Sequence, residues 1–167
     1  MKKIIFLDID GVLNSRRSMI AGTKKFTQLV EAGETDPGAL VAATIDPVAI
    51  ELINAILTRP ATGFVLSSSH RVPFLGAPHP LSAATAYLEK LGVCCDRLIG
   101  LTDNGPGCRG DQVQRWIFEN PDCVDSWVIL DDHADIHEYQ RSRFVQCSHD
   151  DGFSLSNYHA VISLLFK

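Results

Sequence analysis

Short apolar segments alternate with amphipathic ones along this chain, and that alternation limits the possible folds more than any other feature. Five runs rich in Val, Ile and Phe have the composition of strands that are buried on both faces, and each is too short for a core helix. The five predicted strands are residues 3–8, 63–68, 97–101, 127–131 and 143–147.

Helical patterns occupy the segments between these runs. They cover residues 46–57, 81–91, 111–119 and 154–166. The first helix starts with Asp46, a capping residue followed by proline, and the second ends before Gly92, which suits a helix C-cap. We expect the buried face of the first helix to consist of Val48, Leu52, Ala55 and Ile56.

Strands that alternate with helices imply a parallel sheet with helices on both faces, connected by right-handed crossovers. The predicted fold class is therefore α/β, a three-layer α/β/α doubly wound parallel sheet. The chain has 167 residues, of which 46% are apolar and 21% charged, as is typical of a soluble globular protein. Residues 1–167 fit one domain.

The net charge and the N-terminal sequence limit the partners and the location. A net charge of −5 argues against binding nucleic acid over a broad surface, although it is compatible with a local basic patch. The first apolar run is broken by Asp8 and is too short for a signal peptide or a membrane span. We expect a cytoplasmic protein without membrane contact, and no feature indicates an obligate protein partner.

Residues 15–44 do not follow the alternation. The segment contains Arg16, Arg17, Lys24 and Lys25, continues with turn-forming residues and has no strand pattern. We expect a loop or a small cap that is inserted after the first strand and lies above the carboxyl end of that strand.

Cysteine and histidine spacing does not favour zinc or disulfide chemistry. The cysteines are Cys94, Cys95, Cys108, Cys123 and Cys147. None forms a C-x-x-C pair, and we expect most of them to be buried thiols. His133 and His137 have the i, i+4 spacing of a zinc pair, but the nearby sequence provides no third ligand.

Two carboxylates close the first apolar run. Asp8 and Asp10, in FLDIDGVLN, are two residues apart, so on a strand both side chains lie on the same face. Like charges at this distance repel unless a cation lies between them. Gly11 follows directly, lets the chain turn sharply and leaves backbone amides near whatever the carboxylates bind.

Polar residues also follow two other runs, and parallel strands place their carboxyl ends at one edge of the sheet. The second run ends in Ser67-Ser-Ser-His-Arg71, and the fourth ends in Asp131-Asp132, with Asp135 one helical turn later. Up to five carboxylates therefore converge at one edge. Mg²⁺, which prefers oxygen ligands, would offset their repulsion.

In this order the motifs resemble those of the haloacid dehalogenase-like (HAD) superfamily. The matching elements are FLDIDGVL, FVLSS, Arg109 before its helix, and VILDD, and the match extends from residue 4 to about residue 135. The runs SSSHR and RGDQVQRWI are most similar to the small HAD domains related to RNA-repair and polynucleotide phosphatases. The resemblance implies a Rossmann-like HAD fold with a small or minimal cap at residues 15–44.

The resemblance also implies catalytic roles. Asp8 would attack a phosphoryl group in line and form an aspartyl-phosphate. Asp10 would protonate the leaving oxygen and then deprotonate the water that hydrolyses the intermediate. Ser67 would donate a hydrogen bond to a phosphoryl oxygen, and Arg109 would neutralise the developing charge. Arg109 stands where the superfamily often has lysine, and Arg115 is the alternative.

The same resemblance implies a magnesium site. Asp8, the backbone carbonyl of Asp10, Asp131 and Asp132 would hold the ion. Asp132 is favoured as the direct ligand, with Asp131 in support. Asp135 would either orient the motif arginine or cap the short helix that follows.

Gly11, Ser68 and Arg71 are the expected substrate contacts. For Arg71, a surface position or pairing with a carboxylate is an equal alternative. His70 stands where related domains often carry tryptophan, so no contact is carried over to it.

The predicted function is a magnesium-dependent phosphatase that acts on a nucleotide, a nucleic-acid end or another phosphorylated small molecule. A small cap would leave the site open to polymers, and its basic residues could receive a polynucleotide phosphate, although a solvated charged loop is an equal alternative. Two other functions stay open, a phosphoacceptor signalling module and a catalytically silent HAD-like binding protein. The first would not need Asp10, and the presence of all four motifs counts against the second.

Overall fold

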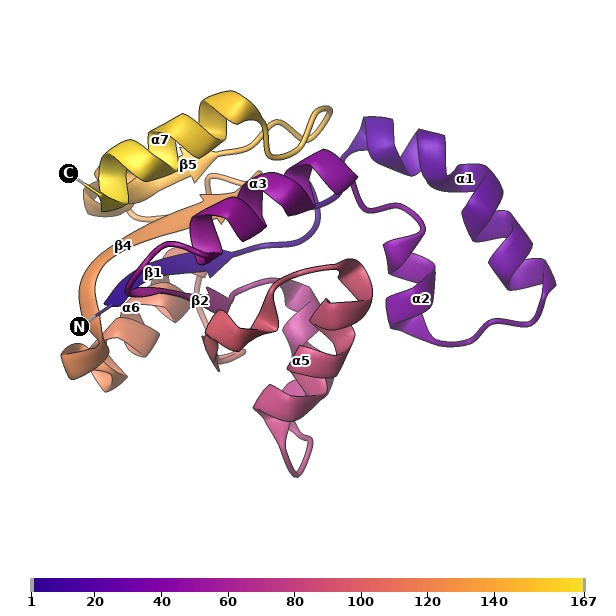
Figure 1. Cartoon of the computed structure of the whole chain (residues 1–167). Coiled ribbons are helices and arrows are strands. Elements are labelled where there is room, and N and C mark those ends of the chain that lie inside the picture. Colours follow the sequence, from indigo (N-terminus) through magenta and orange to yellow (C-terminus); the bar gives the residue numbers. More distant parts are fainter. Residues whose placement is uncertain (1, 167) are drawn as a thin grey trace.

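The five apolar runs form the parallel strands of one sheet (Figure 1). The strands are β1 (Lys2–Leu7), β2 (Thr62–Leu66), β3 (Leu98–Leu101), β4 (Val124–Asp131) and β5 (Phe144–Gln146). Their order is β3-β2-β1-β4-β5, so β1 is central and the chain winds outward in both directions. This computed structural model describes residues 2–166.

Helices cover both faces of the sheet and complete the three predicted layers. They are α1 (Arg16–Glu31), α2 (Pro37–Ala42), α3 (Pro47–Leu57), α4 (Val72–Leu75), α5 (Pro80–Leu91), α6 (Arg109–Glu119) and α7 (Leu155–Leu165). Short 3₁₀ segments occupy Ser69–Arg71, Cys95–Arg97, Pro121–Cys123 and Glu138–Arg143. One apolar cluster joins the sheet to α3, α5 and α7, and a second joins the opposite face to α6. Figure 1 shows α3 and α7 above the sheet and α6 below it.

The central strand contributes to both clusters because successive side chains point to opposite faces. Ile5 and Leu7 pack in the cluster with α3, whereas Phe6 packs with α6. The ring of Phe6 meets the ring of Trp116 edge to face, with centroids 5.6 Å apart. Gly100 in β3 permits this packing, since a Cβ there would lie 2.6 Å from Trp116 Nε1.

The structure confirms the predicted start of α3 and corrects its buried face. Asp46 caps the helix and accepts a hydrogen bond of 2.9 Å from the Val48 amide. Val48, however, is 60% exposed. The residues that face the core are Ala49, Ile53, Ile56 and Leu57. The helix is apolar around most of its circumference, so periodicity could not choose between two faces that differ by one position.

Residues 15–44 form two helices beyond the carboxyl end of β1 (Figure 1). α1 begins after the capping residue Ser15, and none of its residues is buried. α2 packs against α5. An antiparallel bridge between Asn14 and Ile45 brings the two ends of the insertion together.

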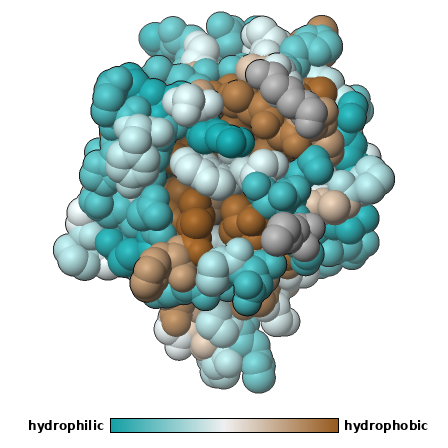
Figure 2. All heavy atoms as spheres, turned by 90° about the vertical axis from the view of Figure 1, so that its left-hand side faces the viewer, coloured by the Kyte–Doolittle hydropathy of each residue, from teal (hydrophilic) through white to brown (hydrophobic). Residues whose placement is uncertain are grey.

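Figure 2 shows the end of the molecule where β1 begins, opposite the carboxyl ends of the strands. Hydrophilic residues surround several separate hydrophobic areas on this face (Figure 2). Every residue of the predicted site lies toward the other end. Among residues 2–166, no helix has the length and apolar composition needed to cross a membrane.

The prediction that most cysteines are buried was wrong. Cys147 is buried, whereas Cys94 and Cys123 are exposed and Cys95 and Cys108 are half-buried. The four that are not fully buried lie in connecting segments or at a helix start, where the chain runs along the surface.

Candidate active site

A cavity of about 550 Å³ opens at the carboxyl edge of the sheet. Its lining includes Asp8, Asp10, Arg109, Asp131 and Asp132. These residues come from the end of β1, the start of α6 and the end of β4. The strand ends that the sequence analysis expected at one edge of the sheet therefore do lie together around this cavity.

Three carboxylates form the centre of this cavity. Asp8, Asp131 and Asp132 each offer an oxygen, and these oxygens lie within 4.8 Å of one another. Burial and the nearby charge of Asp131 raise the pKa of Asp8 to about 6. Burial also raises the pKa of Asp131. Clustered oxygen donors whose charges are costly in this environment fit a hard divalent cation such as Mg²⁺.

Arg109, rather than Arg115, reaches the carboxylates. Its Nε donates to Asp131 Oδ2 at 2.9 Å, and its Nη2 lies 3.6 Å from Asp8 Oδ1. The Asp135 carboxylate accepts a hydrogen bond from the Arg109 amide at 3.2 Å, so it caps α6 and orients the backbone that carries the arginine. Arg115 is instead paired with Asp103 through two hydrogen bonds of 2.6 and 2.7 Å.

Asp10 lies at the rim of the cavity, with its side chain 58% exposed. Asn14 Nδ2 donates to Asp10 Oδ1 at 2.8 Å, and His70 Nε2 lies 3.0 Å from Asp10 Oδ2. The hydrogen bond from His70 lowers the pKa of Asp10, and the same bond raises the pKa of His70. His70 Nδ1 is in turn 2.6 Å from the Tyr87 hydroxyl. Tyr87 lies on the distant α5, and no motif in the sequence indicated that it belongs near the site.

The structure revises the role of Gly11. Its amide donates to Asn14 Oδ1 at 2.9 Å and is therefore already engaged, which does not support the predicted substrate contact. Gly11 has φ +70°, and a Cβ at this position would collide with the Asp132 carboxylate. Glycine at this position therefore lets the backbone after Asp10 approach the Asp132 carboxylate without a clash.

Serine residues after β2 differ in their access to the cavity. Ser67 is fully buried, and its hydroxyl has no hydrogen-bond partner among the described residues. Ser68 is also buried, and its hydroxyl accepts a hydrogen bond from the His70 amide at 3.3 Å. Ser69 lines the cavity, whereas Ser67 and Ser68 do not. The predicted donor role of Ser67 therefore receives no support from this geometry, and it stays a prediction.

The guanidinium of Arg71 is hydrogen-bonded to groups of the protein itself. Its side chain is 1% exposed, and its guanidinium donates to the carbonyls of Ser67, Ser68, Thr102 and Asp103 and to Gln112 Oε1, at 2.5 to 3.2 Å. All five N–H groups of an arginine can be satisfied by such a set. Arg71 thus joins the loops after β2 and β3 to α6. It also lines the cavity, and its predicted substrate contact stays a prediction.

Two histidines near Asp132 were missed as site residues. His149 Nδ1 lies 3.0 Å from Asp132 Oδ2, and His133 Nε2 lies 3.7 Å from the same oxygen. His149 follows β5 in the run Cys147-Ser-His-Asp-Asp151. These polar residues at the carboxyl end of a predicted strand were the available signal.

A doubly wound parallel sheet whose carboxyl edge holds three clustered aspartates and an arginine has the fold and the site of a HAD-like protein. Within that class, the family model described as "HAD domain in Swiss Army Knife RNA repair proteins" matches residues 4–158, and the chain belongs to this family. Membership places it in a superfamily of phosphatases and related hydrolases. No curated protein and no solved structure matches the chain.

Proposed function

We propose that this protein is a magnesium-dependent phosphatase that hydrolyses phosphate monoesters through an aspartyl-phosphate on Asp8. The observation that carries the proposal is the contact of Arg109 with both Asp8 and Asp131 beside the three-carboxylate cluster. A nucleophile, a cation for the transferred group and oxygen ligands for a metal are the parts that phosphoryl transfer needs.

In the proposed first step, one Asp8 oxygen attacks the phosphorus, and the bond between phosphorus and the ester oxygen breaks. Arg109 is placed to neutralise charge on the phosphoryl oxygens, because its guanidinium already lies 3.6 Å from Asp8 Oδ1. Mg²⁺ held by Asp8, the Asp10 carbonyl, Asp131 and Asp132 would screen the negative charge of substrate and carboxylates. The product of this step is the aspartyl-phosphate and a free alkoxide that needs a proton.

In the proposed mechanism Asp10 enters this step in its protonated form, gives that proton to the alkoxide, and the alcohol leaves. The resulting carboxylate then removes a proton from water, which attacks the phosphorus and releases inorganic phosphate and free Asp8. Hydrogen bonds from Asn14 and His70 fix the Asp10 carboxylate at the rim, where solvent and a leaving group can both reach it.

The proposed substrates are nucleotides or phosphorylated nucleic-acid ends. Support comes from the RNA-repair family and from the position of α1 and α2 beyond the carboxyl end of β1, where they would act as a small cap. Arg16 and Arg17 form exposed ion pairs with Asp150 and Asp151, at 3.8 and 3.2 Å. Exposed pairs of this kind are weak, so a phosphate could compete for the arginines.

A phosphatase screen tests this proposal. The purified protein is assayed with Mg²⁺ against nucleotides, sugar phosphates and oligonucleotides that carry 3′- or 5′-phosphates. Asp8→Asn should abolish turnover, because it removes the attacking charge at nearly constant volume. Asp10→Asn should slow substrates with poor leaving groups more than p-nitrophenyl phosphate, whose leaving oxygen needs little protonation.

Three outcomes would contradict the proposal in different ways. Activity near that of the wild type in folded Asp8→Asn would exclude the aspartyl-phosphate mechanism. Stable phosphorylation of Asp8 without turnover would indicate a signalling module. A folded protein that hydrolyses none of the substrates with Mg²⁺ would favour the silent binding protein.

A further inference from the structure

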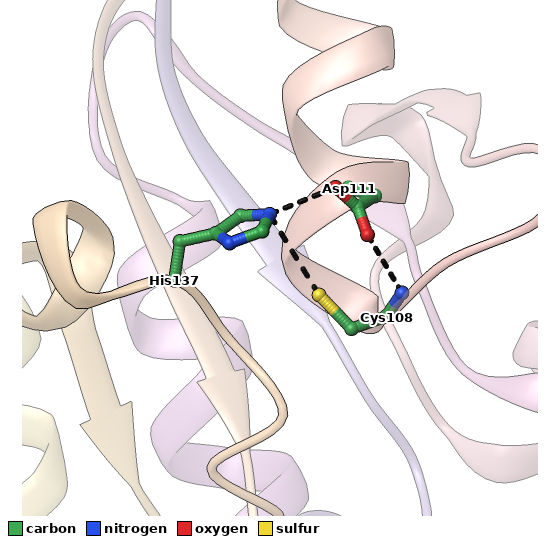
Figure 3. Close-up of side chains that lie close together, drawn as sticks. All are labelled: Cys108, Asp111 and His137. Carbon is green, nitrogen blue, oxygen red and sulfur yellow. Dashed lines mark hydrogen bonds and ion pairs between the residues drawn. The ribbon is translucent and has the colours of Figure 1, made fainter.

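A second group of potential metal ligands lies outside the carboxylate cluster. Figure 3 shows Cys108, Asp111 and His137 pointing toward one another from two separate segments. Cys108 is the N-cap residue of α6, Asp111 belongs to the first turn of that helix, and His137 belongs to the segment that follows β4. The proposed phosphatase mechanism uses none of these three side chains.

The ligand atoms converge on one point. His137 Nε2 lies 2.8 Å from Asp111 Oδ1 and 3.8 Å from Cys108 Sγ, and all three atoms lie within 4.8 Å of one another (Figure 3). Bond lengths of about 2.3 Å for zinc–sulfur and about 2.0 Å for zinc–nitrogen place ligand atoms roughly 3 to 4 Å apart around a tetrahedral ion. The observed distances are close to that spacing.

Backbone contacts orient the carboxylate toward the histidine. Asp111 Oδ2 accepts a hydrogen bond of 2.8 Å from the Cys108 amide, which leaves Oδ1 turned to His137 (Figure 3). Gly107 has φ +101°, and a Cβ there would collide with the Asp111 carboxylate. A Cβ at Gly110 would collide with Gln140 Oε1 and lie 3.0 Å from the His137 amide nitrogen, so glycine lets the segment that carries His137 approach the helix.

The arrangement does not match a nucleophilic triad. In a triad, one imidazole nitrogen contacts the nucleophile and the other contacts the carboxylate. Here Cys108 Sγ and Asp111 Oδ1 both approach the same nitrogen, His137 Nε2. Three ligand atoms around one point are instead the geometry of a metal site.

We propose that Cys108, Asp111 and His137 bind a zinc ion, with water as the fourth ligand. Thiolate, imidazole and carboxylate are the ligands that zinc takes in proteins, and a thiolate disfavours Mg²⁺ and Ca²⁺. The protein binds zinc as the Cys108 thiol releases its proton to solvent. The carboxylate cluster at Asp8 is a separate site for a hard ion.

The zinc ion joins the first turn of α6 to the segment after β4. Arg109 directly follows Cys108, so the ion holds the backbone of the arginine that contacts Asp8 and Asp131. The same two segments are already linked by the hydrogen bond from the Gly110 amide to the Asp135 carbonyl, at 3.0 Å. Zinc binding therefore restricts the movement of this junction.

Cobalt substitution tests the site directly. The full chain is stripped with a chelator, reduced, and titrated with Co²⁺ in the presence of excess Mg²⁺, which occupies the carboxylate cluster. We expect one cobalt per chain with a thiolate-to-cobalt charge-transfer band in the near ultraviolet and intense visible bands of a tetrahedral ion. Zn²⁺ should displace the bands, and phosphatase activity plays no part in the readout.

Variants identify the ligands. Cys108→Ser should remove the charge-transfer band, and His137→Gln should weaken cobalt binding by at least about tenfold. Cys123→Ser is the matched control, because Cys123 is an exposed thiol outside the group, and it should keep the band. Asp132→Asn should also keep the band, since it alters the carboxylate cluster alone.

Three results would each overturn the proposal. They are the absence of a thiolate band in the wild type, a full band in folded Cys108→Ser, and cobalt affinity in His137→Gln that equals the wild-type value. Circular dichroism verifies folding of each variant. If Cys108→Ser does not fold, His137→Gln decides the result, because the His137 side chain is 39% exposed and tolerates replacement.

Discussion

Asp8→Asn should make the metal-free protein more stable at pH 8, although it removes the proposed nucleophile. The Asp8 carboxyl is buried beside Asp131, and its pKa rises from 3.8 to about 6. The difference is about 2 pH units, and each unit corresponds to about 1.4 kcal/mol. The charged form of Asp8 therefore destabilises the folded state by up to about 3 kcal/mol, and asparagine lacks that charge.

The pH dependence follows from the direction of the shift. Because the folded-state pKa of Asp8 is raised, the folded protein holds more protons than the unfolded chain between pH 3.8 and about 6. The stabilising effect of the proton is complete below the lower value and is lost as the pH rises through the higher one. The advantage of Asp8→Asn should therefore be roughly half developed at pH 5 and complete at pH 8.

Thermal unfolding in the presence of a chelator measures this effect. A gain of 1 kcal/mol raises Tm by about 2–4 °C in a domain of this size. Asp10→Asn is the matched control with the opposite sign, because a hydrogen bond from His70 lowers the pKa of Asp10, so its charge stabilises the fold. Suppose instead that Asp8→Asn has the same Tm as the wild type at pH 8, or a lower one. The charged form of Asp8 then does not destabilise the folded state, and the reasoning is wrong.

Three other variants test separate parts of the structure. Mg²⁺ at ten times its Kd should stabilise the wild type by about 1.4 kcal/mol, and Asp132→Asn should lose most of this gain in a melting titration. Arg71→Ala should lower the free energy of unfolding in urea by more than about 3 kcal/mol, because several buried carbonyls lose their donor. Gly100→Ala should cost about 1–3 kcal/mol in the same assay through a clash with Trp116, while an unchanged midpoint would contradict the packing described.

The sheet could be predicted because its strands are short, apolar and separated by helical segments. Two features of the helices could not be predicted in this way. The core-facing side of α3 was wrong by one position, since nearly every position is apolar. α1 was not recognised as a helix, because the segment was interpreted from its basic and turn-forming residues. Its apolar residues Met19, Ile20, Phe26 and Val30 do recur at helical spacing, although none of them is buried.

The site was predictable where it depends on strand ends. Asp8, Asp131 and Asp132 meet because parallel strands end at one edge, and their proposed roles stay predictions. The contact of His70 with Tyr87 was out of reach, since Tyr87 lies on the distant α5 and carries no motif. For Arg71, a substrate contact, a surface position and a carboxylate pair were the alternatives, because a sequence does not show that the carbonyls of two loops surround a buried guanidinium.

The bridge between Asn14 and Ile45 has a consequence for how this protein can diverge. Because the insertion leaves and re-enters the domain at neighbouring points, its length is uncoupled from the register of the sheet. Doubling such a closed segment costs only about 0.6 kcal/mol in chain entropy. Mutation can therefore lengthen, shorten or exchange the α1–α2 segment while the strands remain in place, so this segment can change almost independently of the sheet.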